Sequence, residues 1–228
     1  MKTVVVVGAS RGIGAAVAEY YVGKAERLLG VSRTKTIAGE WVQADLSTPD
    51  GVPKVQRAVS QDVLDALLFM GGTWETDAFT DKYIFECCSD EDIVNVISVN
   101  LIAPIRLLKA LLPALRRSQN PRIVLAGALS GLDNFPSREV ANTASKFGLR
   151  GVVHSLREEL RKDRIGATVI NLGTIGTPEV LGDLAAVGKP EENAVPLDDL
   201  LKVMDCVLSL SRSTGITEID LPAMSDTW

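Results

Sequence analysis

The sequence predicts an α/β fold in which a mostly parallel sheet carries helices on both faces. Short apolar runs of strand length, such as Val4–Val7 and Leu67–Met70, alternate with amphipathic helical segments along the chain. Several of these runs have no polar alternation, which is typical of strands buried on both faces. The 228 residues fit one domain, so we expect residues 1–228 to form a single nucleotide-binding unit.

The first strand leads into a glycine turn and then a helix. Residues 8–14 read Gly-Ala-Ser-Arg-Gly-Ile-Gly, directly after Val4–Val7 and before the helix-forming segment Ala15–Ala18. Such a turn places free amide groups at a helix N-terminus, where a pyrophosphate binds. An ordinary turn that binds nothing is the alternative, but a second strand at Leu28–Val31 has the spacing of a βαβ unit. The candidate phosphate-binding residues are Gly8, Ser10, Arg11, Gly12, Ile13 and Gly14.

The end of the second strand indicates which dinucleotide binds. In proteins that bind NAD, an acidic residue at this place accepts a hydrogen bond from the free 2′-hydroxyl of the ribose. Here the chain has Ser32 and Arg33 instead. Arginine suits the 2′-phosphate of NADP, and Arg11 in the glycine turn offers a second cation. We therefore predict NADP(H) as the cofactor.

The third strand is expected at Trp41–Ala44, followed by Asp45 and Leu46 at the place where the adenine edge would lie. Asp45 is a candidate acceptor for the adenine amino group. The competing interpretation is that Asp45 or Ser47 starts the next helix, which runs from about residue 50 to 60.

The fourth strand, Asp65–Met70, ends at Gly71 and Gly72, which again allow a ligand close to the backbone. The connection Thr73–Cys88 is long and rich in aromatic residues. Long connections in compact domains are usually lids or binding loops, so a pocket-lining segment is predicted, with a short surface helix as the alternative.

A long helix is expected from Ser89, because a hydroxyl cap and three acids suit a helix N-terminus. Its inner face carries Asn100 among apolar residues, so the amide needs a hydrogen-bond partner. Pro104 is a candidate kink.

The remaining elements complete the alternation. Strands are expected at Ile123–Ala126, Ala167–Leu172 and Ile216–Leu221, and helices at residues 140–162 and from Pro196. The whole pattern predicts a Rossmann-type, doubly wound, seven-stranded sheet with strand order 3-2-1-4-5-6-7.

Composition excludes several classes of partner. The formal net charge of −5, without basic blocks, disfavours nucleic acid and anionic membranes. Three cysteines without metal-ligand spacing and a single histidine, His154, give no basis for a metal site or a histidine triad. The N-terminal segment reads as a buried strand, not a signal peptide, and no uninterrupted apolar run has the length of a membrane helix. We expect a cytoplasmic protein.

With these motifs placed, the whole chain resembles the short-chain dehydrogenase/reductase family, whose members bind NAD(P) on this fold. Gly8, Gly12 and Gly14 fit the family's glycine turn, and Asp45 fits its adenine-binding aspartate. The resemblance implies that Asn100 holds a water in the proton relay and that Lys146 binds the nicotinamide ribose. It also implies that a segment near the nicotinamide is formed by Gly173, Ile175 and Thr177, with Leu172 in place of the family's proline.

The sequence departs from the family at the catalytic positions. The family's Tyr-x-x-x-Lys motif places tyrosine one helical turn before lysine, and that position here is Asn142. The substrate-binding serine aligns with Ala128, and Ser130 is expected to point elsewhere. Asparagine donates a hydrogen bond but does not ionise, so a carbonyl reduction needs another proton source.

Three functions remain open, and an oxidoreductase is favoured. The first is an NADPH-dependent reductase of an imine, iminium or conjugated substrate, oriented by Asn142 and Lys146. The second is a carbonyl reductase in which Tyr83, Ser130, Asp133 or Arg138 replaces the tyrosine. The third is a protein that binds NADP without turnover, as a sensor, regulator or partner subunit.

Two further expectations concern the surface of the domain. The short segment Pro178–Val195 lies where the family has its substrate loop and is expected to be a mobile cover. The two long helices, from Ser89 and from Val140, are the family's usual dimer faces, so a homodimer or homotetramer is expected.

Overall fold

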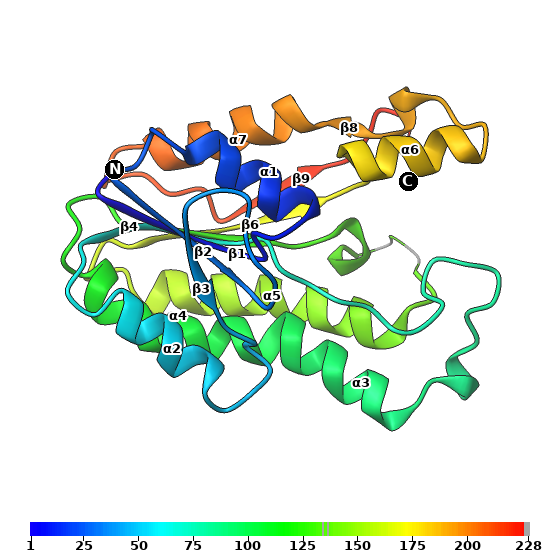
Figure 1. Ribbon diagram of the computed structural model, residues 1–228, viewed down its shortest axis with the longest axis horizontal. Helices are drawn as coiled ribbons and strands as arrows, with labels where there is room; N and C mark the ends of the chain where they lie inside the picture. The colour runs from blue at the N-terminus through cyan, green and yellow to red at the C-terminus, as the bar shows by residue number, and fades with distance from the viewer. Residues whose placement is uncertain (134, 136, 226–228) are drawn as a thin grey trace.

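The computed structural model describes residues 1–133, 135 and 137–225, and it places seven parallel strands in one sheet (Figure 1). Across the sheet the strands follow the order β3-β2-β1-β4-β5-β6-β9, which confirms the predicted order, with β9 as the seventh strand. The strands are β1 (Thr3–Val7), β2 (Arg27–Ser32), β3 (Glu40–Gln43), β4 (Leu64–Phe69), β5 (Arg122–Ala126), β6 (Gly166–Leu172) and β9 (Glu218–Leu221). A separate pair, β7 (Ile175–Gly176) and β8 (Val195–Pro196), lies beyond the sheet.

Helices form a layer on each face of the sheet (Figure 1). One layer contains α2 (Gly51–Ala58), α4 (Ala103–Leu115) and α5 (Val140–Glu159), and the other contains α1 (Gly12–Tyr21) and α7 (Leu197–Ser209). The helix α3 (Asp90–Ile97) leads into α4, and α6 (Pro178–Ala186) lies near the end of α1. The sandwich of two helical layers around a parallel sheet is the predicted doubly wound architecture.

Strand β1 shows why these sequences form a buried parallel sheet. Val5 packs in the core on the α2, α4 and α5 side, and Val4 and Val6 pack in the core beneath α1 and α7. Alternate residues of a strand face opposite sides of the sheet. Because helices cover both sides, all three side chains are fully buried. A strand covered on both faces needs apolar residues throughout, as the unbroken valine run predicts.

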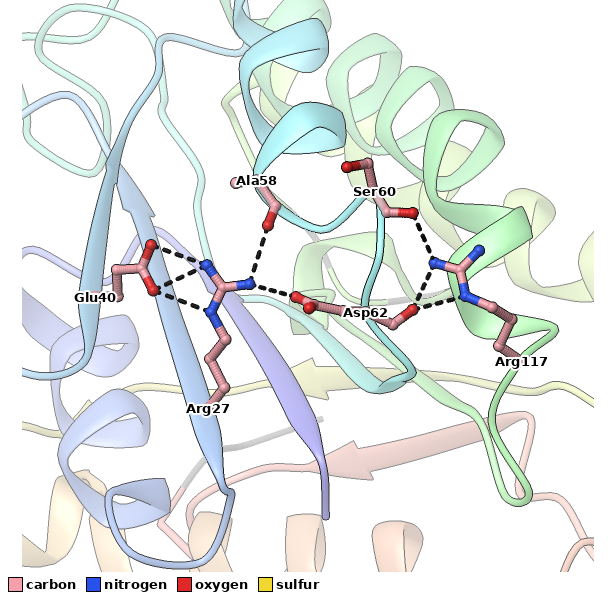
Figure 2. Close-up of polar contacts among 6 residues, drawn as sticks. All are labelled: Arg27, Glu40, Ala58, Ser60, Asp62 and Arg117. Carbon is pink, nitrogen blue, oxygen red and sulfur yellow. Dashed lines mark hydrogen bonds and ion pairs between the residues drawn. The ribbon is translucent and has the colours of Figure 1, made fainter.

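The amino ends of the strands are tied together by two arginines (Figure 2). Arg27 at the start of β2 makes a bidentate contact with Glu40 at the start of β3 and a 2.6 Å ion pair with Asp62. Arg117 donates to the backbone carbonyls of Ser60 and Asp62. These contacts fix the turn after α2 at the edge of the sheet opposite the glycine turns.

The helical run Asp90–Leu115 is interrupted by a π-helical turn, η2 (Ser98–Ile102), where Asn100 lies. Within the described residues this run is the one helix long and apolar enough to cross a membrane by length and composition, with a mean hydropathy of 1.6. Leu107 and Leu111 of its second half are buried in the core against the sheet, which accounts for their apolar character. Pro104 lies in the first turn of α4.

The segment 178–195, predicted to be a mobile cover, contains the helix α6 and a short helical turn, η4 (Glu191–Asn193). Thr177 caps α6, since its hydroxyl accepts the Val180 amide, and Pro178 occupies the first turn. A hydroxyl cap followed by proline is a helix start signal, so the local sequence itself marks where α6 begins.

Candidate active site

The glycine turns after β1 and β4 lie next to each other where the strand order reverses. Gly8 has φ +82°, and a Cβ placed on it would lie 2.7 Å from the backbone of Gly71. A side chain at Gly8 would therefore push the two strand ends apart. This crevice, between neighbouring strands whose crossovers run in opposite directions, is where open α/β sheets bind their ligands.

The residues at the start of α1 fit a dinucleotide phosphate. No side chain caps this helix among the described residues, so its first amide groups are available to an anion. Gly12 has φ +54°, and Gly14 packs so closely that a Cβ would lie 2.2 Å from the Gly8 carbonyl oxygen. Near this cradle Glu179 of α6 also approaches, with Oε2 3.9 Å from a Cβ placed on Gly12.

The residues predicted for the adenosine end lie at the carboxyl ends of β2 and β3. Ser32 is buried and its hydroxyl donates to the Thr34 carbonyl, whereas Arg33 and Arg11 are exposed. Asp45 Oδ1 accepts the amide and hydroxyl of Ser47 in a turn.

The start of α2 and the side chain of Leu46 also lie near the predicted adenosine end. Asp50, not Asp45 or Ser47, precedes the first turn of α2, so the helix-start interpretation of those two residues is wrong. Leu46 is buried and packs in the core.

The residues predicted for the nicotinamide side follow β6. Gly173 donates its amide to the Leu221 carbonyl at 2.9 Å, and Ile175 forms β7. Thr177 is buried, and its hydroxyl is used to cap α6.

Lys146, Asn100 and Gly72 meet in front of the strand ends. A Cβ placed on Gly72 would lie 3.5 Å from Asn100 Oδ1 and 3.8 Å from Lys146 Nζ, so a glycine leaves room for both groups. Lys146 is half-buried as a residue, but its ammonium group reaches inward and donates to the Ala126 carbonyl at 3.1 Å. Burial lowers the pKa of this ammonium group to about 8. Lys146 is therefore able to release a proton near neutral pH.

Asn100 is held by a buried network, which satisfies the predicted need for a partner. Its Oδ1 accepts the Thr73 amide at 2.8 Å and its Nδ2 donates to the Thr73 carbonyl at 2.7 Å, so the amide orientation is fixed by reciprocal bonds. Nδ2 also approaches Ser145 Oγ at 3.1 Å and Asn142 Oδ1 at 3.5 Å. The π-helical turn thus presents Asn100 to both the 73–75 segment and α5, as π-helical turns often do at functional sites.

Asn142 lies one turn before Lys146 on α5 and lines a cavity of about 620 Å³. Its Oδ1 lies 3.5 Å from Asn100 Nδ2, and no hydrogen bond from its own Nδ2 is found among the described residues. Nδ2 is therefore available to donate to a substrate atom. Ala128 and Ser130 both line the same cavity, although Ser130 is expected from the sequence to point elsewhere. The short helical turn η3 (Leu129–Gly131) places Ser130 in the cavity wall.

The other candidate proton donors differ in whether they line this cavity. Arg138 lines the cavity, with its guanidinium group donating to the Tyr83 carbonyl. Tyr83 is not part of the cavity wall: it is 2% exposed, and its hydroxyl oxygen accepts the Val140 amide. Asp133 is exposed and pairs with Arg150 at 3.4 Å. Of these residues, only Ser130 and Arg138 share a cavity with Asn142.

Sequence reasoning missed Glu75, which caps the helix that carries the site. Glu75 is 2% exposed, and its Oε1 accepts the amides of Ala141 at 2.7 Å and Asn142 at 3.1 Å. Together with Tyr83 on Val140, the 73–88 segment satisfies the first three amides of α5. A buried carboxylate at a helix N-terminus is favourable, because the amides and the helix dipole are positive there. No local pattern marks Glu75, since its partners lie 66 and 67 residues away.

Comparison with known proteins identifies the family of this chain. The family model for short chain dehydrogenases matches residues 2–183, and the chain belongs to this family. A short-chain dehydrogenase/reductase, olcF, from Penicillium canescens is 25% identical, covering 96% of this chain and 84% of the relative. Retinol dehydrogenase 8 from Bos taurus is 27% identical, covering 92% and 71%.

Solved structures show the same fold. A metagenomic short-chain oxidoreductase in complex with NADP is 25% identical, with a TM-score of 0.76 and coverage of 98% of each chain. An alcohol dehydrogenase from Thermococcus sibiricus, complexed with 5-hydroxy-NADP, has a TM-score of 0.80 at 21% identity, covering 100% of this chain and 99% of that chain.

Proposed function

We propose that this chain is an NADP(H)-dependent oxidoreductase that reduces a small molecule with an already polarised double bond, such as an imine, an iminium ion or a conjugated system. The observation that carries the proposal is the position of Asn142 one helical turn before Lys146 on α5. Asn142 offers a neutral donor to the cavity, and Lys146 holds a proton that is released near pH 8. The cavity volume is in the range of small-molecule sites.

The cofactor residues support NADP(H). The pyrophosphate would be held by the amides at the start of α1, and Arg11 and Arg33 are exposed cations near the adenosine end. When bound, NADPH supplies the hydride. The nicotinamide ribose would be held by Lys146, beside the glycine turn at Gly72.

The remaining chemistry falls to the chain's own residues. Asn142 Nδ2 donates to the substrate atom on which negative charge develops, and Asn100 fixes the Asn142 carbonyl oxygen. Lys146 holds the proton that the reduced substrate takes up. An iminium ion needs no such proton, and a conjugated system needs less help than a ketone, so the absence of tyrosine at position 142 costs these substrates least.

A turnover assay tests the proposal. Purified protein is mixed with NADPH and separate panels of cyclic imines, enones and ketones, and the loss of NADPH absorbance is followed. We expect turnover of imines or enones to exceed that of ketones. Tight NADPH binding without turnover of any panel would instead support an NADP-binding protein that acts as a sensor, regulator or partner subunit.

The variant Asn142→Tyr separates a carbonyl reductase from a reductase of imines or conjugated systems. If the site is that of a carbonyl reductase without its acid, the tyrosine beside Lys146 should raise the rate of ketone reduction. If the cavity is shaped for substrates that need no acid, the variant should leave ketone turnover low and reduce imine turnover, because the larger ring fills part of the cavity.

The compartment and assembly are also proposals. The cysteines at 87, 88 and 206 are free thiols, consistent with a cytoplasmic protein. Exposed apolar side chains on α3 (Val94), η2 (Ile102), α4 (Ile105) and α5 (Phe147) support a homodimer or homotetramer through these helices. Light scattering should give a mass above that of the monomer, and Phe147→Glu should lower it.

A further inference from the structure

The 73–88 segment presents two large aromatic rings to solvent next to the cavity. Trp74 is 54% exposed and Phe79 is 62% exposed, and their ring centroids lie 5.9 Å apart at an interplanar angle of 67°. Exposed apolar rings that pack on each other form a patch that is costly in water and that usually marks a binding surface. Phe79, unlike Trp74, lines the cavity that contains Asn142.

Phe79 is held in an unfavourable backbone conformation. Its φ of +63° lies in the left-handed region, which a bulky side chain rarely adopts, and Asp77 two residues earlier has φ +59°. The Phe79 amide donates to Glu139 Oε1 at 2.8 Å, while Ser137 donates its hydroxyl to Glu139 Oε2. Backbone strain of this kind persists where surrounding contacts impose it, and it concentrates at functional sites.

Glu139 is well suited to impose this conformation. It is 5% exposed and immediately precedes α5. Its burial acts to raise the pKa of the carboxyl group, but the bonds from Ser137 and Phe79 outweigh burial and hold that pKa below its usual range. The carboxylate therefore stays ionised at neutral pH, and a charged acceptor binds an amide more strongly than a neutral one does.

The cavity wall carries both apolar and polar residues. Besides Phe79, the residues Ala128, Leu129, Phe135 and Leu172 contribute apolar surface, and Ser130, Arg138 and Asn142 are among the polar residues that line it. Apolar surface of this kind suits the ring body of a ligand, and the polar residues suit its polar reacting group.

We propose that Phe79 is a specificity-determining residue whose ring stacks on a flat, apolar ring of the substrate, and that Glu139 is the positioning residue that holds Phe79 over the cavity. This inference rests on the proposed function, since it takes the cavity beside Asn142 as the substrate site. The substrate class is narrowed to planar unsaturated ring compounds.

The test compares two probes with the same two-ring skeleton, flat 2-naphthol and puckered trans-decahydro-2-naphthol. Their affinities for the purified protein are measured by calorimetry, with and without saturating NADP⁺. We expect 2-naphthol to bind at least about tenfold more tightly, because only a flat ring stacks on Phe79. Equal affinities, or no binding of either probe, would overturn the proposal.

Variants identify the residues responsible. Phe79→Leu and Glu139→Ala should each abolish the preference, whereas Glu139→Gln, which retains an oxygen acceptor for the Phe79 amide, should preserve it. Phe85→Leu is the matched control, since Phe85 is 52% exposed in the same segment but does not line the cavity. A preference that survives Phe79→Leu, or that disappears in Phe85→Leu or Glu139→Gln, would contradict the assignment.

The binding measurement needs no turnover, so it separates this inference from the proposed reaction. If the protein prefers flat rings through Phe79 but never oxidises NADPH, the proposed ring recognition is supported and the proposed reduction is contradicted.

Discussion

The proposed site has two halves, a cofactor half and a substrate half, which are built in different ways. The cofactor half is made by local turns: Gly8, Gly12 and Gly14 lie within one strand-turn-helix unit, and Gly71 follows a neighbouring strand. The substrate half is assembled by side chains from distant segments, in which Thr73 binds Asn100 and Glu75 binds the start of α5. A local turn is specified by its own residues, whereas the second half exists only when the chain has folded.

This difference has a consequence for the substitution at position 142. The Asn142 side chain has a structural role although it is not an acid, since its Oδ1 accepts a hydrogen bond from Asn100 Nδ2 at 3.5 Å. The backbone amide of the same residue donates separately to Glu75 Oε1. The substrate half is thus a buried polar network that includes Asn142, a residue of the cavity wall. A substitution in this network should disturb the neighbouring hydrogen-bonded side chains more than a substitution in the cofactor half disturbs its neighbours.

The largest expected effect concerns Lys146, the proposed proton donor. Lys146→Met keeps the length of the side chain and removes the ammonium group, so reduction of an imine or enone should slow by roughly 10² to 10⁴. Single-turnover kinetics at saturating NADPH measure it, which separates chemistry from cofactor binding. Lys162→Met, at an exposed lysine beyond the end of α5, is the control and should leave the rate unchanged.

The next effect concerns the cap on α5. Glu75→Ala leaves the buried amides of Ala141 and Asn142 without acceptors, and it should lower the free energy of unfolding by about 2–3 kcal/mol. Denaturant titration measures the change. Glu75→Gln keeps one acceptor oxygen and should lose clearly less, so equal losses in both variants would show that the cap is not the cause.

The pH dependence of the reaction should follow Lys146. Because burial lowers the pKa of this ammonium group to about 8, the group is mainly protonated below that pH and loses its proton above it. The rate of NADPH-dependent reduction should therefore fall above pH 8, approaching about tenfold per pH unit, if the proton on Lys146 is used. A rate that stays flat to pH 10 would show that the proton on Lys146 is not used in the reaction.

The smallest effect belongs to the cofactor half. Glu179 Oε2 approaches Gly12 in the phosphate cradle, and a carboxylate there opposes a bound pyrophosphate. Glu179→Gln should tighten NADP⁺ binding by about threefold to fivefold at low salt, with a smaller gain at high salt because exposed charges are screened. Glu191→Gln, at an exposed acid in η4, is the matched control; a similar gain there would show only a general charge effect.

Sequence reasoning predicted the fold and most of the local turns. The glycine turn, the strand order and the residues Lys146 and Asn100 follow from patterns that extend over a few residues or from the family resemblance. It placed Tyr83 and Asp133 among the proton donors, and the structure instead uses Tyr83 to bind the Val140 amide and pairs Asp133 with Arg150. Their sequence neighbours could not indicate this, because the partner of each lies on another element.

What the sequence by itself determined is the doubly wound sheet with its glycine-lined crevice, because the alternation of apolar strands with amphipathic helices and the backbone freedom of glycine act locally. Only the tertiary structure decided that Glu75 caps α5, that Ser130 lines the cavity and that Glu139 binds the Phe79 amide. The physical reason is that a buried carboxylate finds its donors across the fold, on segments that the chain brings together only after the sheet and helices have packed.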